Sequence, residues 1–155
     1  MEASDIRPGV SFPPPLLYIG GFGIGIVLEL IAPIGSLPLG LAIAAGVAGL
    51  AGSIALDGAA MLNFARAHTS MIPAKPTTAL VVGGPYRITR NPMYLGMACL
   101  YAGLALAFGV IWALVTLPLM LIAVDRIVIP PEERYMEAHF GDDYRAYKRR
   151  VRRWI

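Results

Sequence analysis

The sequence is short of cysteine, histidine and charge, and each shortage argues against a class of function. Its 155 residues include one cysteine, Cys99, which cannot form an internal disulfide and lies in an apolar run that does not favour a catalytic thiol. The two histidines, His68 and His139, are far apart and lack the neighbours of a Cys/His metal site. We therefore expect no metal centre, and no nucleic-acid partner is expected either.

Positive charge is missing from two long stretches. Residues 8–65 and 91–125 contain no lysine or arginine, although the chain has thirteen of them. The first ten residues carry two acids and one arginine, so they lack the basic region that precedes the apolar core of a signal peptide. We expect the first apolar segment to be retained.

Apolar residues dominate what is present. Hydrophobic residues make up 57% of the chain and the mean hydropathy is +0.64, which is too apolar for an ordinary soluble domain. Because a membrane-spanning helix needs about 20 apolar residues, each stretch without positive charge has room for two spans. The sequence predicts an all-α integral membrane protein, a single domain over 1–155, with spans near 16–32, 39–64, 92–108 and 110–129.

The positions of the basic residues also predict the topology. The turn from Pro33 to Pro38 and the break at Gly109 are uncharged hairpins, and with four spans both lie on the same side of the membrane. Positive residues favour the cytoplasmic side. The N-terminus, the central loop 65–91 and the tail 130–155 are therefore expected to face the cytoplasm.

A polar island over residues 83–96 separates the two pairs of spans. The residue before a proline is kept out of the helical region, so a helix can begin only at Pro92, with Asn91 as its N-cap. The free amides of such a helix start attract anions, and Arg87 and Arg90 add positive charge beside them. The island predicts a carboxylate or phosphate pocket; the alternative is an inert loop at the membrane interface.

Two acidic residues lie inside the predicted spans. Glu29 is close to the first hairpin and can reach the surface, whereas Asp57 lies about two turns inside the cytoplasmic end of its helix. Carboxylates in spans are costly and usually face a cavity or a partner. Asp57 is expected to line the cavity that Arg87 or Arg90 approaches; the alternatives are a pair with Arg66 or a carboxylate hydrated at the interface.

Small residues recur through the first two spans. They are spaced so that helix backbones can approach closely in lipid, and we interpret them as packing positions. The residues concerned are Gly20, Gly21, Gly23, Gly25, Ala45, Ala48, Gly49, Gly52 and Ser53.

The tail predicts two further helices. Pro130 and Pro131 are expected to end the fourth span, with Glu132 and Glu133 in the first turn of a new helix that stops at Gly141. The last helix is amphipathic and predicts an interfacial helix whose basic face binds anionic lipid headgroups. Its apolar face holds Tyr144, Tyr147, Val151 and Trp154, and its basic face holds Arg145, Lys148, Arg149 and Arg152.

Two motifs in this order resemble the isoprenylcysteine carboxyl methyltransferase family and the related phospholipid N-methyltransferases. The first is Gly-Pro-Tyr-Arg-x-x-Arg-Asn-Pro-Met-Tyr-x-Gly over 84–96, and the second is the Glu-Glu pair followed by Met136, Phe140-Gly141 and Tyr-x-x-Tyr at 144–147. The resemblance covers residues from about 14 to 154. It implies an integral membrane enzyme that uses S-adenosylmethionine.

The resemblance also implies which residues form the site. One wall of the cofactor pocket would hold Tyr86, Arg90, Asn91, Pro92, Tyr94 and Gly96, and the other Glu132 and Glu133. The catalytic candidates are Arg90, Glu133 and Asp57. The chain departs from the family pattern at three positions: Asn91 where histidine is common, Met136 where leucine is common, and Arg152 where proline is common. Asn91 occurs in the phospholipid branch, which weakens a specific expectation of a prenylcysteine substrate.

The expected activity is methyl transfer from S-adenosylmethionine to a lipid-like or lipidated acceptor, a carboxylate or an amine, at the cytoplasmic interface. The reaction needs alignment and desolvation rather than a metal. One alternative is a nicotinamide-dependent enzyme similar to sterol reductases, with cofactor phosphates held by Arg87, Arg90 and Lys75. Another is a non-enzymatic membrane protein whose tail binds anionic lipid.

Overall fold

The computed structural model describes residues 13–69 and 78–155, and this part of the chain is helical. The four apolar helices are α1 (Pro14–Ile31), α2 (Leu39–Arg66), α3 (Pro92–Ala107) and α4 (Ile111–Ala123). A 3-10 turn, η2 (Gly84–Arg87), precedes α3. A π turn, η3 (Val124–Val128), joins α4 to α5 (Ile129–Arg150).

Length and composition identify the membrane-crossing helices. Within the described residues, three helices are long and apolar enough to span a membrane, namely α1, α2 and the rod that runs from α4 through η3 into the part of α5 before Gly141. The fourth apolar helix, α3, is shorter, with 16 residues and a length of about 24 Å. The predicted all-α integral membrane fold is confirmed, and all four predicted apolar helices are present.

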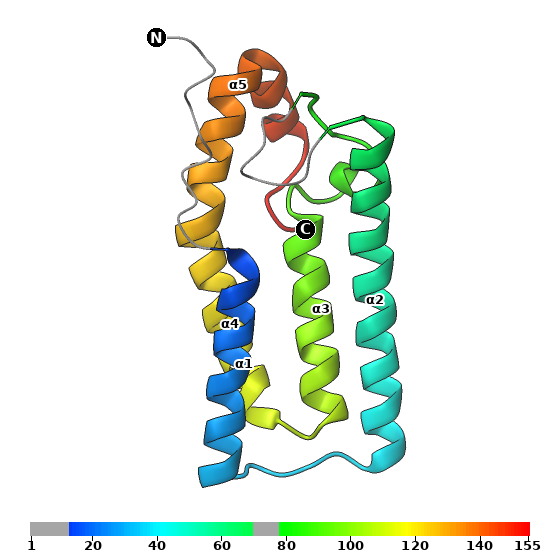
Figure 1. Ribbon diagram of the computed structural model, residues 1–155, viewed down its shortest axis with the longest axis vertical. Coiled ribbons are helices and arrows are strands. Elements are labelled where there is room, and N and C mark those ends of the chain that lie inside the picture. The colour runs from blue at the N-terminus through cyan, green and yellow to red at the C-terminus, as the bar shows by residue number, and fades with distance from the viewer. Residues whose placement is uncertain (1–12, 70–77) are drawn as a thin grey trace.

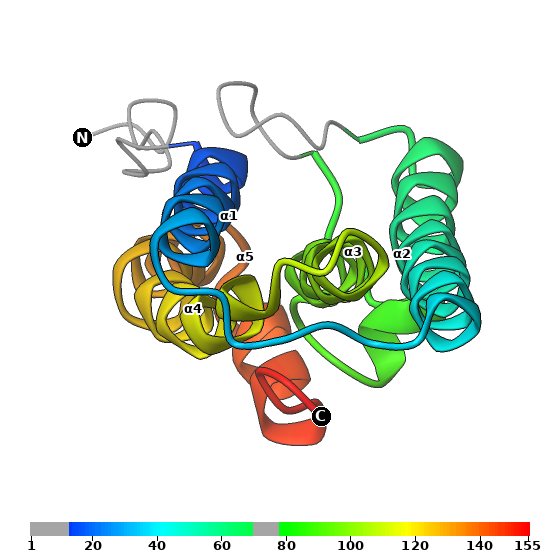
Figure 2. The ribbon, with the colours of Figure 1, turned by 90° about the horizontal axis from the view of Figure 1, so that it is seen from below.

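The four apolar helices run roughly parallel, with α3 between α2 on one side and the pair α1 and α4 on the other (Figures 1 and 2). Both hairpins lie at one end of the bundle. The opposite end holds the loop before α3, the end of α5 and the C-terminal segment, residues 151–155 (Figure 1). This arrangement puts the two sequence motifs at the same end.

Close backbone approach explains how α2 packs on α3. A Cβ atom added to Gly49 would lie 2.5 Å from Cα of Gly103 and 2.6 Å from the carbonyl oxygen of Cys99, so only glycine fits there. Gly25 plays the corresponding part between α1 and α4, where a Cβ would lie 2.7 Å from Cα of Ala113, whereas a Cβ at Gly21 would meet the side chain of Met120. The predicted packing role is wrong for Gly20 and Gly23, because no described neighbour lies within 4 Å of a Cβ at either position.

Glu29 joins the two hairpins. Its Oε1 accepts a hydrogen bond from the amide of Ile34 at 3.2 Å, and its Oε2 accepts one from the amide of Trp112 in the first turn of α4 at 2.9 Å. The indole of Trp112 donates to the carbonyl of Ala32 at 2.6 Å. Glu29 therefore satisfies a free amide at a helix start rather than only reaching solvent.

The fourth span does not end at Pro130 and Pro131, which corrects the sequence prediction. The helix continues from α4 through the π turn into α5, and the two prolines are the second and third residues of α5, within its first turn. Proline is tolerated there because its missing amide has no helical partner at a helix start, and the wide π turn provides such a start within a continuous rod. The rod carries Glu132 and Glu133 past its apolar part, which ends near Ile129. The predicted break at Gly141 is present, with φ of +53°.

Candidate functional site

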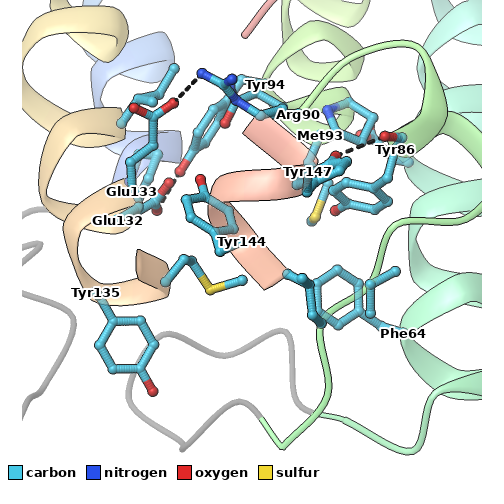
Figure 3. A pocket seen from close by; sticks show the side chains of 18 of the residues that line it. Phe64, Tyr86, Arg90, Met93, Tyr94, Glu132, Glu133, Tyr135, Tyr144 and Tyr147 are labelled. Atoms are coloured by element: carbon cyan, nitrogen blue, oxygen red, sulfur yellow. Dashed lines mark hydrogen bonds and ion pairs between the residues drawn. The ribbon is translucent and has the colours of Figure 1, made fainter. Parts of the chain in front are cut away.

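A pocket of about 510 Å³ lies at the end of the bundle that carries both motifs. Its walls come from the start of α1, the last three turns of α2, the loop and first turns of α3, and α5; Figure 3 shows it from close by. A pocket of this size suits a small molecule. The residues of its polar and aromatic walls are Asp57, Phe64, Tyr86, Arg90, Asn91, Tyr94, Glu132, Glu133, Tyr135, Tyr144 and Tyr147.

An ion pair between Arg90 and Glu133 crosses one wall of the pocket. Nη2 of Arg90 lies 2.7 Å from Oε1 of Glu133, and Nη2 of Arg153 lies 2.7 Å from Oε2. Burial by itself would raise the pKa of Glu133, but the hydrogen bonds and charges of the two arginines outweigh it and hold that pKa below its usual range. Glu133 is therefore an ionised anchor that joins two arginines.

Arg90 also holds the C-terminal segment through the backbone. Its Nη1 donates to the carbonyls of Lys148 at 3.2 Å and Val151 at 3.0 Å, and its own amide donates to the carbonyl of Arg152 at 2.9 Å. Its Nε is buried and has no partner among the described residues. Most of the donors of this guanidinium are thus used within the protein.

Asn91 has the predicted position but not the predicted bond. It precedes Pro92 at the start of α3, yet its side chain does not cap the helix. Its side-chain amide donates instead to the carbonyl of Arg153 at 2.9 Å, and the hydroxyl of Thr89 donates to the same carbonyl at 2.9 Å. The tertiary contact with the C-terminal segment has replaced the local cap.

The C-terminal segment is fixed at a second point by Asp125 in the π turn. Nη1 of Arg153 lies 3.1 Å from Oδ1 of Asp125, and the indole of Trp154 donates to the same oxygen at 2.9 Å. Arg153 therefore bridges Glu133 and Asp125. The segment closes over the wall that Arg90 and Glu133 form.

Glu132 differs from its neighbour because no arginine in the described part of the chain pairs with it. Its Oε1 accepts a hydrogen bond from the hydroxyl of Tyr94 at 2.6 Å, joining α5 to α3 across the pocket (Figure 3). Burial raises the pKa of Glu132 to about 7, with the hydrogen bond from Tyr94 opposing the shift and the charge of Glu133 adding to it. This carboxyl changes protonation near neutral pH and is available to a ligand.

Asp57 lines the same pocket from α2. Its Oδ2 accepts a hydrogen bond from the hydroxyl of Ser53 at 2.9 Å, and its carboxylate lies against Gly96 of α3. An added Cβ at Gly96 would lie 2.5 Å from Cγ of Asp57. Gly96 is not part of the pocket lining, and its place in the site is to leave room for this carboxylate.

The aromatic wall comes partly from the tail. Tyr144 and Tyr147 are buried against Tyr86 and Ala60, and the hydroxyl of Tyr147 donates to the carbonyl of Tyr86 at 2.7 Å. Phe64 packs edge-on against Tyr86, with ring centroids 5.7 Å apart. The apolar face of the predicted interfacial helix, which holds Tyr144 and Tyr147, therefore packs on protein.

The helix that carries this face is also shorter than predicted. It ends at Arg150, and Val151 is extended with φ of −121°. Trp154, which the helical period placed beside the tyrosines, packs instead against the cluster around Val124 and Ile129.

The pocket brings together most of the predicted site residues. Arg87 is exposed and is not among the lining residues, and Lys75 lies outside the described residues. Sequence reasoning missed Arg153, Asp125 and Thr89. Arg153 lies in a basic run where no pattern distinguishes it from its neighbours. The Tyr-x-x-Tyr spacing of the second motif carries a signal for Tyr144 and Tyr147, although neither is among the site residues that the sequence predicts.

The model of the phospholipid methyltransferase family matches residues 41–143, more than half of the chain. An uncharacterized protein of Haemophilus influenzae is 35% identical over 63 residues, which are 41% of this chain and 100% of that protein. No solved structure matches. The resemblance carried by the two motifs is confirmed, and the chain belongs to the phospholipid methyltransferase family of membrane methyltransferases.

Proposed function

We propose that this protein transfers a methyl group from S-adenosylmethionine to a lipid-like or lipidated acceptor at the cytoplasmic face of the membrane. The observation that carries the proposal is the convergence of two distant motifs, residues 86–94 and 132–147, on one acidic and aromatic pocket at the end of an apolar bundle. A water-soluble donor and a membrane-dissolved acceptor can meet at such a place. Family membership supports the reaction class.

The lining fits this cofactor by charge and by shape. S-adenosylmethionine carries a sulfonium, an ammonium and a carboxylate, so it is a net cation. The aromatic faces of Tyr86, Tyr144 and Tyr147 suit a cationic group through cation–π attraction. Glu132 can accept hydrogen bonds from an ammonium or from ribose hydroxyls.

The residues of the pocket act by position and by excluding water. When bound, S-adenosylmethionine supplies a methyl carbon whose bonding electron pair stays on sulfur as the acceptor attacks. Arg90 and Glu133 fix the wall on which the cofactor would lie, and the closed aromatic side keeps water from the reacting atoms. A carboxylate acceptor attacks directly. An ammonium acceptor must first lose a proton, and in this proposal Asp57 or Glu132 takes it.

The charge of the pocket argues against a nicotinamide cofactor. Among the described lining residues Arg90 is the sole cation, and it is already paired with Glu133. The phosphates of such a cofactor would therefore meet three carboxylates, from Asp57, Glu132 and Glu133, and one neutralised guanidinium. A role restricted to binding anionic lipid leaves this pocket unexplained.

Two measurements test the proposal. Calorimetric titration of the detergent-solubilised protein with S-adenosylhomocysteine should give saturable binding, and the same titration with reduced nicotinamide dinucleotide should not. Membranes that contain the protein, supplied with a donor bearing a heavy methyl group, should yield labelled lipids or lipidated proteins by mass spectrometry. Saturable nicotinamide binding, or no binding of either molecule, would refute the proposal.

A further inference from the structure

Tyr18 is a buried tyrosine of α1 that belongs to neither sequence motif. Only 5% of its surface is exposed, and its hydroxyl donates a hydrogen bond to the backbone carbonyl of Tyr94 at 3.0 Å. A buried tyrosine hydroxyl needs such a partner, whereas a phenylalanine would fill the same space without one. What the hydroxyl adds at this position is therefore the bond to α3.

This bond lies at the end of α3 that faces the pocket. Tyr94 is the third residue of α3, in its first turn. α1 packs mainly on α4 and makes a smaller contact with α3. Within that contact the ring of Tyr18 meets the ring of Tyr101 edge-on, with centroids 6.2 Å apart. The hydroxyl and the ring of one side chain therefore hold α3 at two points about two turns apart.

Tyr94 carries this restraint into the pocket. Its own hydroxyl donates to Oε1 of Glu132 at 2.6 Å, the bond that joins α3 to α5 across the pocket (Figure 3). A tyrosine hydroxyl lies at the far end of a rigid ring, so a small tilt of the first turn of α3 lengthens this bond and weakens it. Holding the carbonyl of Tyr94 therefore holds its hydroxyl on Glu132.

The protonation of Glu132 depends on this bond. Burial raises the pKa of Glu132 to about 7, and the hydrogen bond from Tyr94 opposes that shift by stabilising the charged form. The titratable and charged groups that face Glu132 come from four elements: Asp57 of α2, Tyr86 of η2, Arg90 and Tyr94 at the start of α3, and Glu133 and Tyr144 of α5. Of these, Tyr94 is the group that donates a hydrogen bond to it.

We propose that Tyr18 is a positioning residue of the candidate site, which holds the first turn of α3 so that the hydroxyl of Tyr94 stays on Glu132. Tyr18 is not among the lining residues and acts through Tyr94. Its consequence for the reaction rests on the proposed methyltransferase function, in which Glu132 meets the cofactor or takes a proton from the acceptor. Without the hydroxyl of Tyr18, Glu132 stays protonated to higher pH and does either less well.

Infrared spectroscopy of the detergent-solubilised protein tests the inference without ligand or turnover. The carbonyl band of the protonated Glu132 carboxyl, identified by its loss in Glu132→Gln, is followed as the pH rises. Tyr94→Phe removes the hydrogen bond to Glu132, so the midpoint should rise by about 1 pH unit. Tyr18→Phe should raise it by about half as much. Tyr18→Phe added to Tyr94→Phe should give no further rise, because the hydroxyl that Tyr18 positions is then absent.

Tyr101→Phe is the matched control. It also removes a buried hydroxyl, but one that pairs with Thr116 of α4 rather than with the site. It should lower the melting temperature as Tyr18→Phe does and leave the midpoint of Glu132 unchanged. An unchanged midpoint in Tyr18→Phe, an equal shift in Tyr101→Phe, or a full additional shift in the double variant would overturn the inference.

Titration with S-adenosylhomocysteine separates this inference from the proposed function. Tyr18→Phe should weaken binding about twofold near pH 7, where fewer molecules carry an ionised Glu132, and hardly at all at about pH 8.5. Equal weakening at both pH values would indicate general damage to the fold and overturn the inference. If wild type binds no S-adenosylhomocysteine while the infrared midpoints shift as expected, the methyltransferase proposal fails and the positioning of Glu132 through Tyr18 stands.

Discussion

Arg90 and Glu133 are 43 positions apart in the sequence and form an ion pair at 2.7 Å, with most of both side chains buried. The pair joins the loop before α3 to α5, and so connects the two motifs that the sequence places on opposite sides of a helical hairpin. Breaking a buried ion pair leaves an uncompensated charge and is strongly destabilising.

Replacing Arg90 by lysine keeps the charge but removes the planar group that reaches Glu133 and two backbone carbonyls together. We expect Arg90→Lys to weaken S-adenosylhomocysteine binding and methyl transfer at least tenfold, or about 1.4 kcal/mol, and to lower the melting temperature. The matched control is Arg87→Lys, since Arg87 is exposed and is not in the pocket lining. If Arg87→Lys proves the more damaging change, the proposed part of Arg90 is wrong.

Arg153 and Arg152 offer a test of what the basic tail does. Each substitution by alanine removes one positive charge, but only the side chain of Arg153 pairs with Glu133 and Asp125. We expect Arg153→Ala to destabilise the folded protein by about 2 kcal/mol and to weaken cofactor binding, while Arg152→Ala changes neither measurably. Thermal unfolding and calorimetry measure both. Equal effects would mean that the tail acts through surface charge alone.

Glu132 makes stability depend on pH. Burial raises its pKa from 4.5 to about 7, so the folded protein holds this proton more tightly than the unfolded chain. The stabilising contribution is complete below about pH 4.5 and is lost as the pH rises through about 7, a change of about 3 kcal/mol. Between pH 5 and 8 the wild type should lose stability relative to Glu132→Gln in denaturant titrations. A constant difference between the two proteins would contradict this assignment.

The α2–α3 contact should not tolerate a methyl group at Gly49. An added Cβ there meets the backbone of α3, which cannot move aside as a flexible side chain can. We expect Gly49→Ala to destabilise the protein by about 1–3 kcal/mol. A Cβ added to Gly58 in the same helix would have no described neighbour within 4 Å. Gly58→Ala should therefore be neutral or stabilise the protein by up to about 1 kcal/mol. Thermal unfolding in one detergent compares the two.

Orientation in the membrane can be read from two exposed positions at opposite ends of the bundle. Ser36 lies in the first hairpin, and Thr78 lies in the loop before α3. In a background without Cys99, cysteines at these positions should react with a membrane-impermeant reagent from opposite sides, with Thr78 on the cytoplasmic side. Labelling of both from one side would refute the four-span topology.

Much of the fold follows from the sequence because its causes are local. The absence of positive charge from residues 8–65 and 91–125, together with the hairpins at Pro33–Pro38 and Gly109, located the helices to within about two residues at most of their ends. Pro92 starts α3 as predicted, since proline suits a first helical position. Gly109 and Gly141 interrupt helices with φ of +68° and +53°, a region that glycine adopts without strain.

Only the tertiary structure decided which of several suitable partners each side chain would take. Asn91 was a good local cap, but the carbonyl of Arg153 is a competing acceptor that becomes available only when the C-terminal segment folds back. The period that gathers Tyr144 and Tyr147 on one face predicts an apolar contact without distinguishing lipid from protein. In the sequence, Arg153 is one of several basic residues in a row. It differs from Arg152 because its side chain pairs with Glu133 and Asp125, which lie 20 and 28 residues away. The sequence determined by local chemistry where helices begin and end, whereas long-range packing determined which charges are buried, which are paired, and which are left for a ligand.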